Sequence, residues 1–182
     1  MRRSADQAFA DLRRHLEDWK QAGAKPGLRI FVYPPEGEPR MLARFPLFAK
    51  EIGSTVPISI VDVGQEFLAE LERRNGLVDR LTRLEHEGTE RLLRDLGELA
   101  HRYLTRLLAT PLDPPALVRL LVNTGALGTF VSYSAITNAL HGDGPARTVA
   151  ALTVIAFPGE GDERQLNLLG LRADTNYRVP RI

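Results

Sequence analysis

The stretch VPISIVDV, Val56–Val63, decides the fold. It consists mainly of valine and isoleucine, which favour extended backbone, and its apolar side chains occupy both faces of the expected strand. A strand that is apolar on both faces is typical of a parallel sheet covered by helices on both sides. The stretch therefore predicts a buried strand of an α/β protein.

Strand and helix patterns alternate on both sides of this stretch. Further strands are predicted at Leu28–Tyr33, Leu117–Val122 and Thr148–Phe157. Helices are predicted at Ser4–Lys20, Arg40–Ile52 (begun or interrupted by Pro46), Gln65–Arg74, Leu77–Leu108 and Gly128–Leu140. Because neighbouring parallel strands need a crossover connection, this order predicts a mainly parallel sheet of about four to five strands, flanked by helices.

We expect one α/β domain spanning residues 1–182. Residues 1–22 should form an N-terminal amphipathic helix, because Phe9, Leu12 and Leu16 repeat at steps of three and four. Residues 64–110 should form a helical insertion between the second and third strands, and Thr89 is a candidate N-cap within it.

The composition excludes several kinds of chemistry. The chain has no cysteine, which rules out disulfides, thiolate zinc sites and a cysteine nucleophile, and fits an intracellular protein. The 24 basic and 23 acidic side chains give a formal net charge of +1, so no global field favours nucleic acid. No apolar stretch approaches the roughly 20 residues that a membrane span needs. We expect a cytoplasmic protein that does not enter membranes.

Turn-rich, partly acidic segments follow the four predicted strands. They are residues 33–38, 62–64, 123–125 and 157–160. The carboxyl ends of parallel strands lie at one rim of a sheet, which is where open α/β folds usually bind ligands. The sequence therefore predicts that these four segments meet at that rim.

The first of these segments resembles a phosphate loop in position but not in chemistry. Phosphate loops use glycine N–H groups and a lysine, whereas FVYPPEGE, Phe31–Glu38, has two prolines without N–H groups and two carboxylates. Pro34 and Pro35 are more simply interpreted as ending the strand and stiffening the turn. Sequence signatures of dinucleotide binding, paired-histidine zinc sites and serine hydrolases are also missing.

Carboxylates at the rim leave one catalytic alternative open. Glu36, Asp62 and Glu160, together with Glu38 and Asp162, could hold Mg²⁺, because hard cations take oxygen ligands. The alternative function is then a metal-dependent nuclease or phosphatase. The simpler interpretation is that these residues are solvated parts of turns.

The C-terminal tail carries an aromatic residue beside a basic one. Tyr177 and Arg178 are residue types that are enriched at protein interfaces. The tail could equally form a terminal strand that docks on its own sheet, with Tyr177 packed and Arg178 paired.

Five stretches stand in order between about Leu28 and Ile182. They are IFVYPPEGE, LVNTGALGTFVSYSAITNAL, VIAFPGEG, LNLLGL and NYRV. In order and spacing they resemble the BrxB family of the bacteriophage-exclusion (BREX) defence systems, formerly a domain of unknown function. The resemblance is collective, since no single stretch is diagnostic.

This resemblance implies a non-enzymatic component of a defence operon that also encodes an ATPase, a DNA methyltransferase and PglZ, an alkaline-phosphatase-like protein. It implies an adaptor that docks PglZ-like and other BREX proteins, meets DNA only within such a complex if at all, and needs no cofactor. The family has no catalytic residues to carry over. The candidate partner-binding residues are Tyr33, Pro34, Pro35, Glu36, Asn123, Thr124, Phe157, Pro158, Tyr177 and Arg178.

Overall fold

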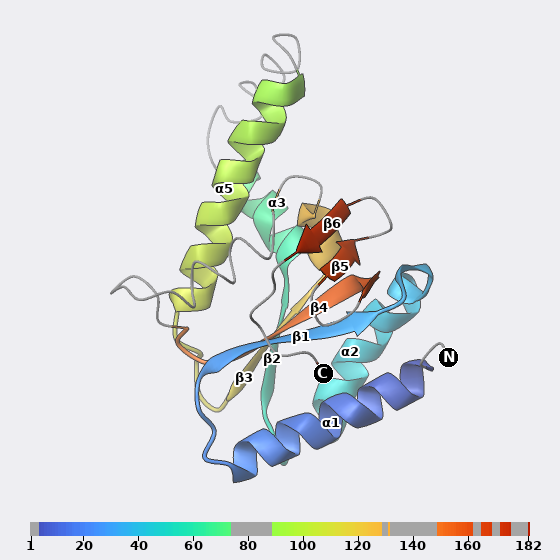
Figure 1. Cartoon of the computed structure of the whole chain (residues 1–182). Coiled ribbons are helices and arrows are strands. Elements are labelled where there is room, and N and C mark those ends of the chain that lie inside the picture. Colours follow the sequence, from blue (N-terminus) through green and yellow to red (C-terminus); the bar gives the residue numbers. More distant parts are fainter. Residues whose placement is uncertain are drawn as a thin grey trace.

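Four parallel strands form the centre of the molecule (Figure 1). The computed structural model describes residues 4–73, 89–128, 131, 149–161, 165–168, 172–175 and 182. The strands are β1 (Gly27–Tyr33), β2 (Ile58–Asp62), β3 (Val118–Val122) and β4 (Leu152–Gly161). They lie in the order β1-β4-β3-β2, and all three pairings are parallel. The predicted parallel α/β fold is confirmed.

Helices cover both faces of this sheet. On one face lie α1 (Ala5–Gln21) and α2 (Glu38–Ile52), and on the other lie α3 (Val63–Arg73) and α5 (Thr89–Ala109). Because successive side chains of a strand alternate between faces, β3 sends Leu120 to the α1/α2 side and Leu121 to the α3/α5 side. The two-sided apolar pattern of the central strand β3 therefore reflects two separate hydrophobic cores. The prediction that Val56–Val63 forms a buried strand is wrong, because β2 lies at the edge of the sheet and only Val61 of its five residues is buried.

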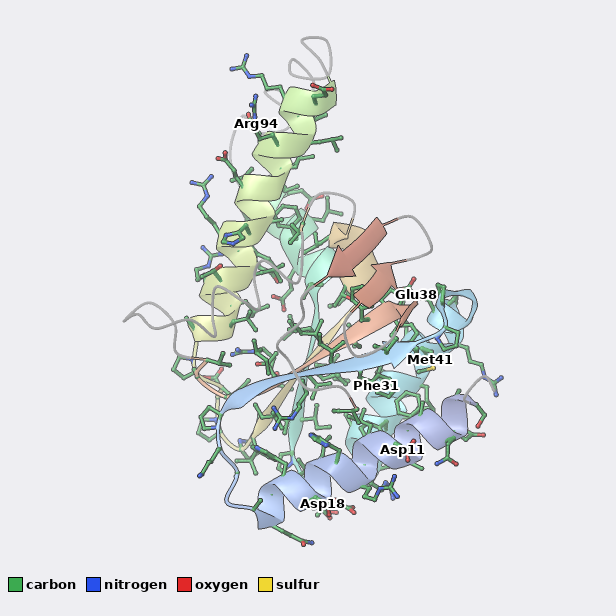
Figure 2. The ribbon with its side chains drawn as sticks, viewed as in Figure 1. Asp11, Asp18, Phe31, Glu38, Met41 and Arg94 are labelled. Atoms are coloured by element: carbon green, nitrogen blue, oxygen red, sulfur yellow. The ribbon has the colours of Figure 1, made fainter. Side chains whose placement is uncertain are left out.

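The core under α1 and α2 contains a cluster of aromatic rings, here called the aromatic core, among aliphatic side chains. Its rings come from α1, β1 and α2, and their centroids lie 5.1–6.2 Å apart, in tilted or edge-on pairs: Phe9, Phe31, Tyr33, Phe45 and Phe48. Figure 2 shows Phe31 on β1 directed toward these helices. This arrangement fixes where α1 and α2 lie relative to the sheet, and it forms the floor of the groove between them.

Helix α1 begins and packs as its sequence predicts. The Ser4 hydroxyl oxygen accepts a hydrogen bond of 3.2 Å from the backbone N–H of Gln7, which is the N-cap interaction. The predicted apolar stripe, including Leu12 and Leu16, is buried against the sheet. Trp19 donates its indole N–H to the carbonyl oxygen of Lys25 at 2.7 Å, which ties the end of α1 to the loop before β1.

The predicted effect of Pro46 on α2 is wrong. The helix runs from Glu38 to Ile52, so Pro46 neither begins nor interrupts it. Pro46 lies on the exposed side, whereas Phe45 and Phe48 beside it are buried in the aromatic core. Burial of these rings outweighs the loss of one helical hydrogen bond, which is a tertiary effect that local propensity does not contain.

The predicted turn at residues 157–160 is also wrong, because β4 continues through it. Pro158 is the register partner of Tyr33 in the parallel sheet. Beyond it, Gly159–Gly161 pair with Leu166–Leu168 of the antiparallel strand β5 (Gln165–Leu168), which in turn pairs with β6 (Arg172–Thr175). The chain thus passes straight from the parallel sheet into a small antiparallel one.

The helical insertion between β2 and β3 is present as α3 and α5, while residues 74–88 between them lie outside the described part of the chain. The predicted helix at 128–140 falls almost entirely on residues that are not described. Among the described helices, none has the length and apolar character that crossing a membrane requires.

Candidate functional site

The carboxyl ends of the parallel strands define the candidate site. After β1 the chain turns toward the α2 face, and after β3 it leads to Leu127 and Val131, which pack on the opposite face. Strand β4 lies between β1 and β3. In open α/β sheets, the point where neighbouring connections leave to opposite faces is the usual ligand crevice. Here that point lies above the end of β4.

The described residues at this point pack closely against one another. Gly125, in the 3₁₀ turn Thr124–Leu127 after β3, packs so closely that an added Cβ would lie 3.1 Å from Cγ of Pro158 and 3.4 Å from Oε1 of Glu38. The side chains of Thr124 and Pro158 are buried. The turn after β3, the end of β4 and the first turn of α2 are therefore in close contact at the rim.

Glu38, at the first turn of α2, is a partly buried carboxylate within this packing. The Tyr33 hydroxyl donates to its Oε1 at 3.2 Å. Burial raises the pKa of the Glu38 carboxyl because the charged form loses solvation, and the hydrogen bond from Tyr33 opposes this rise. Figure 2 places Glu38 at the end of the molecule where β1 passes into α2.

The substitution Glu38→Gln should change how stability depends on pH. A raised carboxyl pKa means that the folded protein holds its proton more tightly than the unfolded chain, so this contribution to stability is lost as the pH rises through the folded-state pKa. Relative to the wild type, Glu38→Gln should therefore become more stable between about pH 4 and about pH 7. Urea unfolding at both pH values measures this difference, and a pH-independent difference would contradict it.

Asp62, at the end of β2, accepts hydrogen bonds from two different segments. Its Oδ1 accepts a hydrogen bond of 2.9 Å from the backbone N–H of Gln65, which caps the start of α3. The same oxygen accepts a 2.9 Å hydrogen bond from Nδ2 of Asn123. Asn123 has a left-handed backbone, with φ of 56°, where asparagine is well tolerated. The ends of β2 and β3 are joined in this way.

Substitutions of Asp62 separate capping from charge. Asp62→Asn keeps an oxygen that can accept from Gln65, and asparagine caps helices about as well as aspartate, so we expect a loss below about 1 kcal/mol. Asp62→Ala removes the cap and leaves Asn123 without its acceptor, so a loss of about 2 kcal/mol is expected. Urea unfolding of both variants is the measurement. Equal losses would show that the carboxylate charge, and not the cap, is what matters.

The structure places the predicted partner-binding residues in three groups. Tyr33, Thr124, Phe157 and Pro158 are buried, so their side chains support the rim from within. Those that are partly exposed at the rim are Pro34, Pro35 and Asn123. Tyr177 and Arg178, and the side chain of Glu36, lie outside the described part of the structure.

The turn Pro34–Pro35 does what its composition predicts. Pro34 has extended backbone, with φ of −60° and ψ of 132°, and Pro35 opens the short 3₁₀ helix Pro35–Gly37 that leads into α2. Strand β1 therefore ends where the first proline begins.

Of the hypothetical metal ligands, only Asp62 and Glu38 have side chains within the described part of the chain. Asp62 caps α3 and Glu38 accepts from Tyr33, while the side chains of Glu36 and Glu160, with all of Asp162, lie outside it. Within the described part of the chain, no group of three or more histidine, aspartate or glutamate side chains is arranged to hold a metal ion.

Sequence reasoning missed a buried cation, Arg119 on β3. Its side chain is 2% exposed, and Nη2 donates to the carbonyl oxygen of Thr110, just after α5. Among the described residues, its Nε and Nη1 have no hydrogen-bond partner, and the same is true of the hydroxyl of its register neighbour Thr153. Burial lowers the pKa of the guanidinium. The signal was present as the one charged residue in the strand pattern LVRLLV.

The fold defines a three-layer α/β protein in which the turn after β3 packs against the end of β4 at the rim of the parallel sheet. Comparison of the chain with protein-family models, with curated proteins and with solved structures finds no match.

Proposed function

We propose that this protein is a non-enzymatic adaptor of a BREX phage-defence system, which docks a PglZ-like protein and other BREX components in the cytoplasm. DNA would be met only within such a complex, and no cofactor is required. One observation supports this proposal above the others: the stretches that resemble the BrxB family converge in one region of the fold.

The convergence is direct for four of the five stretches. Residues 31–33 pair with residues 156–158, and β3, which precedes the turn at 124–127, lies on the other side of β4. Residues 159–161 pair with 166–168. The fifth stretch, NYRV, lies outside the described residues. Sequence stretches that assemble into one packed unit are consistent with a common structural role, as expected for a binding scaffold.

The known roles of the rim side chains point the same way. Asp62 caps a helix, Thr124 donates to the carbonyl oxygen of Ala156, and Glu38 accepts from Tyr33. These contacts hold strand ends together. Because the polar groups named here already serve the fold, they support a scaffold role more than a catalytic one.

Co-expression with the PglZ-like protein of the same operon tests the proposal. We expect the two chains to co-purify through a tag on either one. They should also elute as a single complex at about 10 μM, a concentration at which complexes with micromolar dissociation constants stay associated. An unrelated alkaline phosphatase with the same tag is the control. The proposal is contradicted if the two chains elute separately and the protein forms no complex with any other BREX component.

The competing hypothesis of a metal-dependent nuclease or phosphatase is decided with the same preparation. Calorimetric titration with Mg²⁺ or Mn²⁺ and assays on DNA and on a phosphate monoester should give neither heat nor turnover. If the wild type shows activity and Glu36→Gln abolishes it, the enzyme hypothesis replaces the adaptor proposal.

A further inference from the structure

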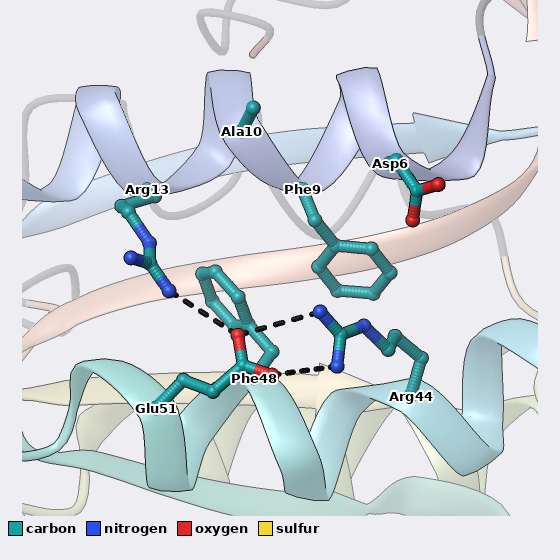
Figure 3. A pocket seen from close by; sticks show the side chains of 7 residues that line it. All are labelled: Asp6, Phe9, Ala10, Arg13, Arg44, Phe48 and Glu51. Atoms are coloured by element: carbon teal, nitrogen blue, oxygen red, sulfur yellow. Dashed lines mark hydrogen bonds and ion pairs between the residues drawn. The ribbon is translucent and has the colours of Figure 1, made fainter.

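A groove runs between α1 and α2 on the side of these helices that faces away from the sheet (Figure 3). Its volume is about 280 Å³, and its walls include Arg13 from α1 and Arg44 and Glu51 from α2. A second hollow of about 260 Å³ shares Arg44 and reaches Leu47. The two hollows share Asp6 and Arg44 and so lie next to each other along α2.

Two arginines converge on one carboxylate in this groove. Arg44 approaches Glu51 with Nη1 at 2.6 Å from Oε1 and Nη2 at 3.3 Å from Oε2. Arg13, from the facing helix, places Nη2 at 3.2 Å from the same Oε2. Figure 3 shows both guanidinium groups directed at Glu51. Asp6 also lines this hollow, so its two arginines are balanced by two carboxylates, and the one positive charge in excess comes from Arg40 in the second hollow. The paired guanidinium groups of Arg13 and Arg44 have the geometry by which proteins bind carboxylates, with Glu51 as the carboxylate now held.

The floor and edge of the groove are apolar. The rings of Phe9 and Phe48 line it, and the Arg44 guanidinium lies 5.8 Å from the centroid of the Phe9 ring, a cation–π distance that holds the arginine over the floor. Leu47, at the edge of the second hollow, is 55% exposed. Arginine is enriched in protein-binding hot spots, and here two arginines stand over an aromatic floor, with the exposed Leu47 beside them as further apolar surface.

We propose that this groove binds a protein segment that carries an acidic side chain next to apolar ones. The acidic group would join Glu51 between Arg13 and Arg44, and the apolar side chains would cover Leu47 and the aromatic floor. The identity of the partner rests on the proposed function, since the segment would belong to a BREX component. The chemistry of the groove stands independently of that identity.

Nucleic acid fits this groove less well than protein does. A phosphate backbone needs a run of cations, whereas here Asp6 and Glu51 stand among Arg13, Arg40 and Arg44, which leaves one positive charge in excess across both hollows. An isolated carboxylate flanked by apolar side chains matches both the charge and the floor.

Variants with opposite expected signs test the groove in complexes with the PglZ-like protein. Arg13→Gln, Arg44→Gln and Leu47→Ser should each weaken binding about tenfold. Glu51→Gln should strengthen it about threefold or more, because it removes the competing carboxylate. If the substitutions acted only by distorting the groove, all four variants would bind more weakly. The matched controls are Arg14→Gln, on α1 outside the groove, and Leu68→Ser, whose leucine is 56% exposed on α3.

A model ligand tests the groove without any BREX partner. A fluorescent peptide that alternates leucine and glutamate should bind the wild type, and the same variants should shift its affinity in the same directions. Its lysine counterpart, a short DNA duplex and inorganic phosphate are the competitors. Equal binding of both peptides, or displacement by phosphate or DNA at comparable concentration, would overturn the inference.

The two experiments separate the two proposals. If the wild type fails to bind any BREX component, the proposed function is wrong, and the model peptide alone decides the groove. If the complex forms but is unchanged in all groove variants and the acidic peptide does not bind, the adaptor remains and the groove is excluded.

Discussion

Replacing Phe45 with alanine is expected to lower the free energy of unfolding by about 3–5 kcal/mol. Phe45 is fully buried and lies at the centre of the aromatic core, with ring centroids 5.3 Å from Phe9, 6.0 Å from Phe31 and 6.0 Å from Tyr33. The cavity would open between two helices and the sheet, where rigid rings on every side limit how far the core can collapse.

Urea unfolding followed by far-ultraviolet circular dichroism measures this loss. Leu47→Ala, on the same helix but with an exposed leucine, is the control and should change stability by less than about 0.5 kcal/mol. Because a domain of this size is stable by only about 5–15 kcal/mol, Phe45→Ala should lower the unfolding midpoint markedly. A loss below about 1.5 kcal/mol, the range of a volume-conserving swap, would mean that the aromatic core is packed differently.

Gly64→Ala should have the second largest effect, a loss of about 2–4 kcal/mol when overpacking and a lost hydrogen bond are combined. A Cβ at this position would lie 2.6 Å from Nδ2 of Asn123 and 2.9 Å from Cβ of Ala126. The methyl group would push Asn123 away from Asp62 and so uncouple the ends of β2 and β3. Gly64 is therefore required for close approach and not for an unusual backbone angle.

The double variant Gly64→Ala with Asn123→Gly distinguishes this cause from others. Glycine accepts the left-handed backbone at position 123 and removes the side chain that clashes, so the two changes together should cost less than the sum of the single changes. Gly37→Ala is the neutral control, because its nearest atom would be Cγ of Met41 at 3.9 Å. Additive losses in the double variant would place the strain at Ala126 instead.

The sequence was sufficient to predict those elements whose pattern is local. The three-four spacing of Phe9, Leu12 and Leu16 predicts α1, and the apolar, β-branched run of Val56–Val63 predicts the strand β2, although not its place at the sheet edge. Parallel pairing followed from the alternation of strands and helices, because crossovers require it. These inferences succeeded since each depends on neighbouring residues or on chain connectivity alone.

The parts that failed depend on residues far away in the chain. Pro158 and Gly159 are turn formers locally, but Tyr33 on one side and β5 beyond keep them extended. Burial of Phe45 and Phe48 keeps α2 helical through Pro46.

The groove could not be predicted for the same reason. Arg13 and Glu51 meet only because α1 and α2 pack side by side. One local signal existed, since Arg44 and Glu51 are two helical turns apart on one face of α2. That spacing does not predict that Arg13 of α1 lies across the groove.

Arg119 has a consequence for how β3 finds its place in the sheet. The strand VRLLV is buried on both faces, so apolar side chains alone would allow it to slide by one residue, which exchanges the two faces. Such a slip would drive the guanidinium into the aromatic core under α1 and α2, away from the Thr110 carbonyl oxygen that it now contacts. We infer that Arg119 helps to specify the register of β3. Burying its guanidinium lowers the stability of the native fold, but any other register of β3 would lower it further.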